Sequence, residues 1–257
     1  MAKIGVFDSG VGGFSILSEV KKKLPDHEYY YFSDDAFGPY GSKNEEQIIQ
    51  RMETIVSEFC DHSIDLVIVA CNTATLAGID SLRSSFPKTA FVGVEPYVNA
   101  IHKESKRRPL TKPALLLTQA SFKSARYSAL NRKIKDSDRI KTIVLPRLAT
   151  LIESAYWNGL DSSMVSEITK ELAPLMSYNP SHVILACTHY SLIKPIIQKL
   201  TKAKCITPCQ AVAKRVESLI ATLPKRAIPI TSSDDFLFKR SSLNSWELKA
   251  LDSLKIQ

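Results

Sequence analysis

Two short segments of this chain follow the same pattern. Residues 65–73 (DLVIVACNT) and 181–189 (SHVILACTH) each hold an unbroken apolar run, reach an Ala-Cys pair and continue with polar side chains. Buried parallel strands read as such runs, and ligands in open α/β sheets bind beyond the carboxyl ends of the strands. We therefore expect Cys71 and Cys187 at two strand ends, facing each other across one cleft.

Two further residues are placed to assist these thiols. His189 lies two positions after Cys187, so in an extended segment both side chains share one face, and the imidazole is a candidate proton partner. Asp8 follows the first predicted strand directly and is expected to point into the same cleft. Together they suggest chemistry in which protons move.

Inversion of a carbon acid is the chemistry that uses both cysteines. One base must remove a proton from one face of the carbon while an acid returns a proton to the other face. Two thiols on opposite walls satisfy this symmetry. A thiol pKa near 8.5 can be lowered by a neighbouring His or a helix N-terminus, so a thiolate can be available near neutral pH. Asp8 and His189 would then tune the thiols.

Two other chemistries stay open at this point. In a cysteine hydrolase or acyl transferase, Cys187 would be the nucleophile, His189 the base and Asp8 the residue that orients it, which leaves Cys71 without a role. A metal or ligand-binding module could use Cys71, Cys187 and His189. However, the sequence has neither a C-x-x-C pair nor an HExxH helix.

A glycine-rich segment, residues 8–13 (DSGVGG), follows the first strand. It does not fit a dinucleotide fingerprint, because Ser15 stands where that motif needs glycine. We interpret the glycines as allowing backbone N–H groups to approach a small anion at a helix start. The simpler alternative is that Ser9 or Asp8 caps the helix.

Other polar residues are ordinary when taken alone. Residues 39–41 (PYG) are typical of a turn, and Glu153 is typical of a solvated helix face after Pro146. Cys60, Cys205 and Cys209 are interpreted as packing residues, since none of them forms the paired spacing of a structural zinc site.

The elements that must position these residues alternate along the chain. Helical spacing covers residues 45–62 and 163–175, and 245–254 also reads as a helix, whereas 103–112 reads as an exposed loop. Strand-like runs occur at residues 4–7, 29–32, 66–70, 90–94, 114–117, 140–145 and 183–186, with another short start near 228. This alternation predicts an α/β fold with mainly parallel sheets in two α/β domains.

Composition limits the class of protein. The chain has 257 residues, 44% of them hydrophobic and 23% charged, which is ordinary for a globular protein. The formal net charge of +8 is scattered, so we expect no dedicated nucleic-acid site. No apolar stretch approaches a membrane span, and the odd count of five cysteines favours free thiols and a cytoplasmic location. Both a monomer and a homodimer stay open.

Four motifs together make the match to a family specific. Residues 7–13 (FDSGVGG), 39–41 (PYG), 70–74 (ACNTA) and 186–190 (ACTHY) resemble the signature stretches of the cofactor-independent glutamate racemases, within the aspartate/glutamate racemase superfamily. Residues 94–96 (VEP) and 148–153 add weaker matches in the same order. The resemblance runs from residue 4 to about 216.

The resemblance implies two pseudo-symmetric α/β domains with the active site between them, residues 1–96 plus 208–257 and residues 97–207. It implies interconversion of L- and D-glutamate without pyridoxal phosphate, other cofactor or metal, supplying D-glutamate for peptidoglycan. The small-molecule partner is thus an amino acid. By motif, Cys71 and Cys187 transfer the proton, assisted by Asp8, His189 and Glu153. The positions matching substrate-binding residues are Ser9, Tyr40, Gly41, Asn72, Thr73, Ser121 and Thr188.

The chain departs from the family pattern at three places. Ser121 replaces a threonine, keeping the hydroxyl; residues 207–210 (TPCQ) replace a segment that is normally acidic; and Tyr97 stands where small residues are common. None of these touches the proton-transfer set. They leave aspartate open as an alternative substrate.

Overall fold

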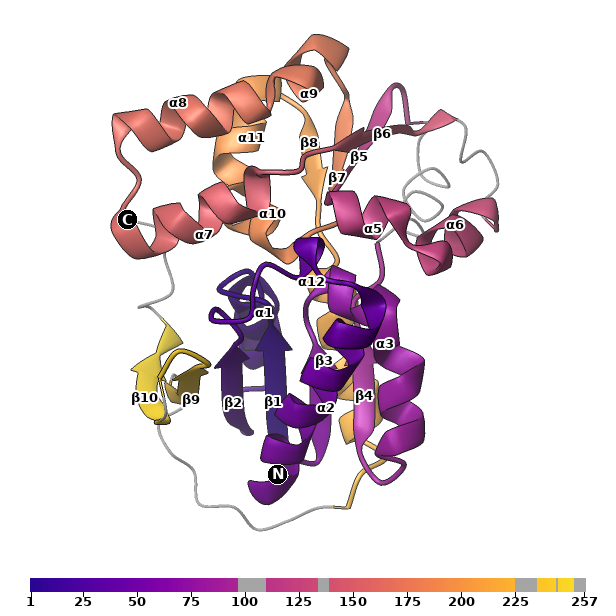
Figure 1. The fold of residues 1–257 in the computed structure, drawn as a ribbon, viewed down its shortest axis with the longest axis vertical. Coiled ribbons are helices and arrows are strands. Elements are labelled where there is room, and N and C mark those ends of the chain that lie inside the picture. The colour runs from indigo at the N-terminus through magenta and orange to yellow at the C-terminus, as the bar shows by residue number, and fades with distance from the viewer. Residues whose placement is uncertain (97–109, 134–138, 225–234, 244, 252–257) are drawn as a thin grey trace.

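The chain forms two α/β lobes, each built on its own β-sheet (Figure 1). This computed structural model describes residues 1–96, 110–133, 139–224, 235–243 and 245–251. We call the lobe with the six-stranded sheet the first lobe and the lobe with the four-stranded sheet the second lobe. In the view of Figure 1 the second lobe lies above the first.

The elements of the first lobe come from both ends of the chain. Its strands are β1 (Lys3–Asp8), β2 (Glu28–Ser33), β3 (Leu66–Val69), β4 (Ala90–Gly93), β9 (Asp235–Arg240) and β10 (Glu247–Ala250). Its helices are α1 (Phe14–Lys23), the 3₁₀ turn η1 (Tyr40–Ser42), α2 (Glu45–Asp61), α3 (Asn72–Ser85) and α12 (Cys209–Ile220).

The second lobe is continuous in sequence. Its strands are β5 (Pro113–Leu117), β6 (Lys141–Val144), β7 (His182–Leu185) and β8 (Lys204–Ile206). Its helices are α5 (Gln119–Lys123), α6 (Ala125–Arg132), α7 (Leu148–Asn158), α8 (Ser162–Glu171), α9 (Ala173–Tyr178), α10 (Thr188–Leu192) and α11 (Lys194–Thr201).

The two sheets share one strand order. The first runs β10-β9-β2-β1-β3-β4 and the second β6-β5-β7-β8, so β2-β1-β3-β4 corresponds strand by strand to β6-β5-β7-β8. All pairings within these two sets are parallel, and only β10 is antiparallel. Strand β3 therefore corresponds to β7, and the two Ala-Cys segments follow equivalent strands.

Alternation along the strands explains the core of the first lobe. Ile4, Val6, Leu66 and Ile68 face one side of the sheet, where α1 and α12 pack. Their sequence neighbours face the other side, where α2 and α3 cover them; these include Phe7, Tyr30, Phe32, Val67 and Val69. Because both faces are covered, the central strand β3 is apolar throughout, as is typical of a buried parallel strand.

The second sheet is covered in the same way. Ala114, Leu116, Val183 and Leu185 pack against α7 to α11, and the opposite face, including Leu115 and Ile184, packs against α6. Leu76 of α3 joins that second cluster, so a helix of the first lobe contributes to the core of the second.

The structure confirms the expected α/β class with mainly parallel sheets and the helix over 45–62. Every strand of the first sheet lies within residues 1–96 or 208–257, and every strand of the second within 97–207. We keep the division into two domains at these boundaries as a proposal. No helix among the described residues is long and apolar enough to cross a membrane.

One sequence prediction of a helix was wrong. Residues 247–250, predicted as helix, form the edge strand β10, because β9 offers it an antiparallel partner that local periodicity does not reveal. The helical segment predicted over 163–175 is confirmed as α8 and α9, with a break at Leu172 because Pro174 prevents continuation. Strands β8 and β9 were not predicted. The loop expected at 103–109 and the strand start near 228 lie outside the described residues.

Candidate active site

Both Ala-Cys segments open onto one cavity of about 350 Å³ between the lobes. The cavity is lined by Cys71 from the first lobe and Cys187 from the second. Of the other predicted site residues, those that also line it are Ser9, Tyr40, Gly41, Asn72, Thr73, Glu153, Thr188 and His189. The structure thus brings together these predicted residues from five separate segments at the carboxyl ends of the strands.

Cys71 is the N-cap residue of α3. Its sulfur accepts a hydrogen bond from the Ala74 backbone N–H at 3.5 Å, and its thiol lies 3.6 Å from the Ser9 hydroxyl. Burial, and then the negative charge of Asp8, raises the pKa of the Cys71 thiol to about 12. The thiol form is therefore favoured at Cys71.

The surroundings of Cys187 are different. His189 from the same segment lies between two carboxylates, with Nε2 2.8 Å from Glu153 Oε2 and Nδ1 3.9 Å from Asp8 Oδ2. Burial alone would lower the pKa of His189, but hydrogen bonding with Cys187 and Glu153 and the charge of Asp8 raise it well above its ordinary value. The imidazolium form is favoured beside Cys187.

Asp8 is not among the residues that line the cavity, but it contacts the second-lobe half of the site. It is fully buried, and its Oδ1 accepts a hydrogen bond of 3.0 Å from the Thr188 hydroxyl. Its Oδ2 has no hydrogen-bond partner among the described residues. Burial raises the pKa of the Asp8 carboxyl to about 6, although the positive charge of His189 opposes this.

Glu153 is held inside the site by hydrogen bonds. Its residue type and position alone had suggested a solvated helix face. Its Oε2 accepts hydrogen bonds of 2.8 Å from His189 and from the Val11 backbone N–H, and its Oε1 accepts one of 2.8 Å from Trp157 Nε1. Burial would raise the pKa of Glu153, but these hydrogen bonds and the charge of His189 bring it below the ordinary value.

The glycines of residues 8–13 leave room for side chains of the second lobe. A Cβ atom at Gly10 would collide with the Glu153 carboxylate, and one at Gly12 would collide with Thr188 and His189. The anion that the backbone N–H of Val11 approaches is thus the chain's own Glu153 carboxylate. The capping alternative was wrong, because Gly13 is the N-cap of α1 and no side chain caps it.

Polar groups on the first-lobe wall are held from behind. Asn72 donates from Nδ2 to the Val94 carbonyl at 2.8 Å, which leaves its buried Oδ1 without a partner. The Tyr40 hydroxyl donates to Asp34 at 2.7 Å, and Arg51 pairs with both oxygens of that buried carboxylate. The turn that carries Tyr40 and Gly41 is therefore anchored to β2.

Ser121 does not line the cavity. It is fully buried, and its hydroxyl lies 3.3 Å from that of Thr73 and 3.0 Å from that of Thr118. These hydroxyls join the start of α3 to the end of β5 across the two lobes.

Sequence reasoning missed several residues that line the cavity, among them Asp35, Thr118, Gln119, Pro146, Ala149 and Thr150. Thr118 and Pro146 follow β5 and β6, so the strand-end rule that found the cysteines would have found them as well. Cys205 and Cys209 are buried as predicted, whereas Cys60, predicted to pack, is exposed on α2. Among the described residues, no group of three His, Cys, Asp or Glu side chains could hold a metal ion.

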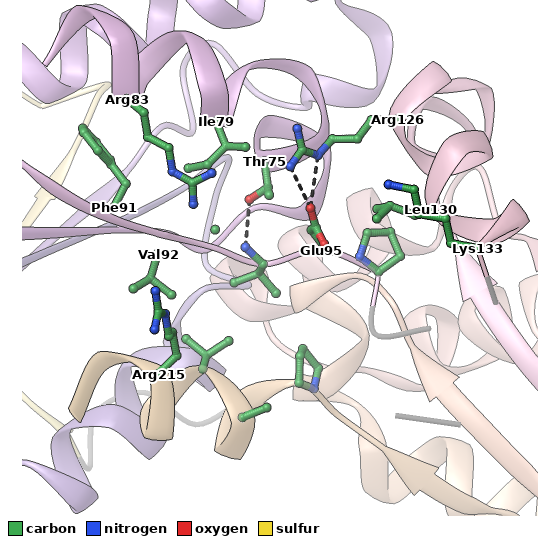
Figure 2. A pocket seen from close by; sticks show the side chains of 16 residues that line it. Thr75, Ile79, Arg83, Phe91, Val92, Glu95, Arg126, Leu130, Lys133 and Arg215 are labelled. Atoms are coloured by element: carbon green, nitrogen blue, oxygen red, sulfur yellow. Dashed lines mark hydrogen bonds and ion pairs between the residues drawn. The ribbon is translucent and has the colours of Figure 1, made fainter. Parts of the chain in front are cut away.

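A second cavity, of about 460 Å³, lies beside the end of β4 (Figure 2). It is lined by Val94, Glu95 and Pro96 and by basic side chains of both lobes, Arg83, Arg126, Lys133 and Arg215. Arg126 points at Glu95, with Nη2 at 2.8 Å, and also pairs with Asp80. Neither cysteine lines this cavity.

Comparisons with known proteins agree with this geometry. The family model for Asp/Glu/hydantoin racemases matches residues 15–216. The chain belongs to this family. It is 35% identical to the glutamate racemase of Aliarcobacter butzleri, over 84% of this chain and 83% of that one. It is 33% identical to the glutamate racemase of Pseudomonas aeruginosa, over 86% and 82%.

A solved structure gives the same relation in three dimensions. The racemase fold of this chain resembles Escherichia coli glutamate racemase in complex with L-glutamate and the activator UDP-MurNAc-Ala, with a TM-score of 0.82 and 27% identity. That match covers 95% of this chain and 90% of the other.

Proposed function

We propose that this member of the racemase family interconverts L- and D-glutamate by two-base proton transfer at Cα, with Cys71 and Cys187 as the bases and without a cofactor. The observation that carries the proposal is that equivalent strands of the two lobes, β3 and β7, each present a cysteine to one cavity. A nucleophile needs one thiol, whereas inversion needs an acid and a base on opposite faces.

In one direction the Cys71 thiolate removes the α-proton from one face and the Cys187 thiol gives a proton to the other. In the reverse direction the two residues exchange roles. The raised pKa of Cys71 means that this residue is a thiol before substrate binds. The ammonium group of a bound amino acid adds a positive charge to this buried site, which favours the Cys71 thiolate. Next to Cys187, His189 is the candidate proton partner, and its own pKa is raised.

The cavity suits an amino acid with two carboxylates. No Lys or Arg is among the described residues that line it, so a carboxylate would be held by hydroxyl groups such as those of Ser9 and Thr73 and by the N-terminus of α3. These donors are fixed before substrate arrives, which is the arrangement that stabilises developing charge on the carboxylate in the transition state. The unpartnered Oδ1 of Asn72 suits the substrate ammonium.

The location and product use form part of the same proposal. Two reduced thiols in one site require a reducing compartment, and all five cysteines are free, so we place the activity in the cytoplasm. The family relation suggests that the D-glutamate enters peptidoglycan.

A racemisation assay in D₂O tests the proposal. Each enantiomer of glutamate should convert to the other with deuterium incorporated at Cα, and aspartate should convert at least 10²-fold more slowly. Faster turnover of aspartate would reassign the substrate. Loss of amino acid from an ester or amide, with an acylated Cys187 seen by mass spectrometry, would replace racemisation with hydrolysis.

A further inference from the structure

Trp157 holds the oxygen of Glu153 that His189 does not use. The two residues lie four positions apart on α7, and the indole Nε1 donates to Glu153 Oε1 at 2.8 Å. Oε2 is then left for His189 and the Val11 backbone. Trp157 is not among the residues that line the cavity, so it acts on the carboxylate from behind.

The indole ring is itself fixed by the opposite lobe. The guanidinium of Arg240, at the end of β9, lies 4.0 Å from the centroid of the Trp157 ring, which is the geometry of a cation–π contact. On the second-lobe side, the ring of Tyr156 meets that of Trp157 edge-on at 5.0 Å. Both aromatic residues also pack against the core of the first lobe.

Arg240 is in turn fixed at the rim of the cavity. Its Nε donates to Asp35 Oδ2 at 2.7 Å, and Asp35 lines the cavity. Ser242 donates to the same carboxylate from its backbone N–H and its hydroxyl, and Ser241 from its hydroxyl. An unbroken series of contacts therefore runs from the cavity rim of the first lobe through Arg240 and Trp157 to Glu153 in the second.

We propose that Trp157 and Arg240 are positioning residues for the Cys187 half of the site: they set the orientation of the Glu153 carboxylate towards His189 when the lobes are together. The proposal rests on the two-cysteine mechanism above. It assigns to the C-terminal strand β9 a part in proton transfer, although β9 contributes no side chain that contacts His189, Glu153 or either cysteine in the described structure.

The proposal predicts an effect on one half of the reaction. Trp157→Phe keeps the ring under Arg240 but removes the N–H donor, and Arg240→Gln removes the cation while keeping a polar side chain. Either change should slow the Cys187 proton transfer relative to the Cys71 transfer. We expect kcat to fall about tenfold in both variants, with KM changed less than threefold.

Primary isotope effects with α-deuterated L- and D-glutamate separate positioning from a general structural defect. When the Cys187 step limits the rate more, the isotope effect rises for the enantiomer that Cys187 deprotonates and falls for the other. In both Trp157→Phe and Arg240→Gln, the isotope effect should rise for the enantiomer that Cys187 deprotonates and fall for the other. Arg126→Gln is the matched control, because Arg126 also bridges the lobes but contacts Asp80 and Glu95. The proposal would be overturned if Arg126→Gln showed the same shift in isotope effects. It would also be overturned if the isotope effects for the two enantiomers were equal in Trp157→Phe and Arg240→Gln.

A second measurement does not depend on turnover. Titration of His189 followed by NMR should show a lower pKa in Trp157→Phe than in the parent protein, because the carboxylate turns away from the imidazole. An unchanged or higher pKa would show that Glu153 stays in place without Trp157 and would contradict the positioning role. Failure of the parent protein to racemise glutamate would overturn the proposed function instead, and the NMR result would still decide the positioning.

Discussion

The ends of β3 and β7 are equivalent in topology but differ in their chemistry. Each strand stops at Ala-Cys and presents its thiol to the same cavity. Around Cys71 the polar neighbours are the Ser9 hydroxyl and the Ala74 N–H, whereas Cys187 has the His189 imidazole held between two carboxylates. The repeated fold places the two sulfurs, and the residues that follow each cysteine give each one a different polar environment.

The fold sets the positions of both thiols, but the source of positive charge differs between the two strand ends. At the β7 end, the protein itself supplies a positive charge beside the thiol. At the β3 end, burial and the charge of Asp8 oppose ionisation of Cys71, so the charge that helps must arrive with the substrate. The two cysteines are paired by the fold but have unequal surroundings.

Replacing either cysteine should have the largest effect. Cys71→Ser and Cys187→Ser should each lower kcat for racemisation by about 10³-fold or more, since a hydroxyl is a much weaker acid and cannot exchange roles with the remaining thiol. Cys205→Ser is the control, as Cys205 is also buried but lies on β8 away from the cavity. Turnover that survives in one of the two variants would show that the two cysteines do not act as a pair.

Alkylation of Cys71 in the empty enzyme tests the inequality directly. With its pKa raised to about 12, the Cys71 thiol should react with iodoacetamide at pH 8 about 10³-fold more slowly than a free cysteine with a pKa near 8.5. Peptide mass spectrometry between pH 7 and 10 gives the rate, which should keep rising over this range. The exposed Cys60 supplies the internal reference, and a Cys71 rate that levels off by pH 9 would contradict the assigned inequality.

The glycine loop offers a way to disturb the β7 end from the first lobe. In Gly10→Ala the new methyl group displaces the Glu153 carboxylate, and kcat/KM should fall about 10²-fold. A double-mutant cycle with Glu153→Ala checks the cause. If the methyl acts only through Glu153, the double variant is no worse than Glu153→Ala, and additive losses would point to a different defect.

Asp8 interacts with residues at the ends of both β3 and β7, and its raised pKa should make the unfolding free energy depend on pH. A carboxyl whose folded pKa is raised from 3.8 to about 6 stabilises the fold below pH 3.8, and that contribution is lost as the pH rises through about 6. The unfolding free energy of the parent protein should therefore fall by about 2 to 3 kcal/mol relative to Asp8→Asn between pH 3.5 and 8. Urea unfolding at both pH values measures this, and a constant difference would contradict the raised pKa.

Local patterns predicted the strand ends well because the signal is local. The apolar runs before Cys71 and Cys187 determine buried strands, and the polar residues that follow must then lie at the sheet edge. The site roles themselves stay predictions. Glu153 could not be understood this way, because its partners Val11 and His189 are distant in sequence and meet only when the lobes assemble.

The failures have the same origin. The segment that forms β10 looks helical until β9 is beside it, and β9 has no place until it pairs with β2. The burial of Asp34 could not be predicted either, because Arg51 and Tyr40 satisfy its carboxylate from other elements. In both cases long-range contacts set the environment of the residues.

The pairing of β2 with β9 also fixes an order of events during synthesis. The first lobe begins with residue 3, but β9 cannot join its sheet until the ribosome has made the second lobe and then residue 240, and β10 must follow. Loop closure over such a separation is slow. Strand β9 also delivers Arg240 to Trp157, so a nascent chain that stops after the second lobe has both cysteines and still lacks this contact between the lobes.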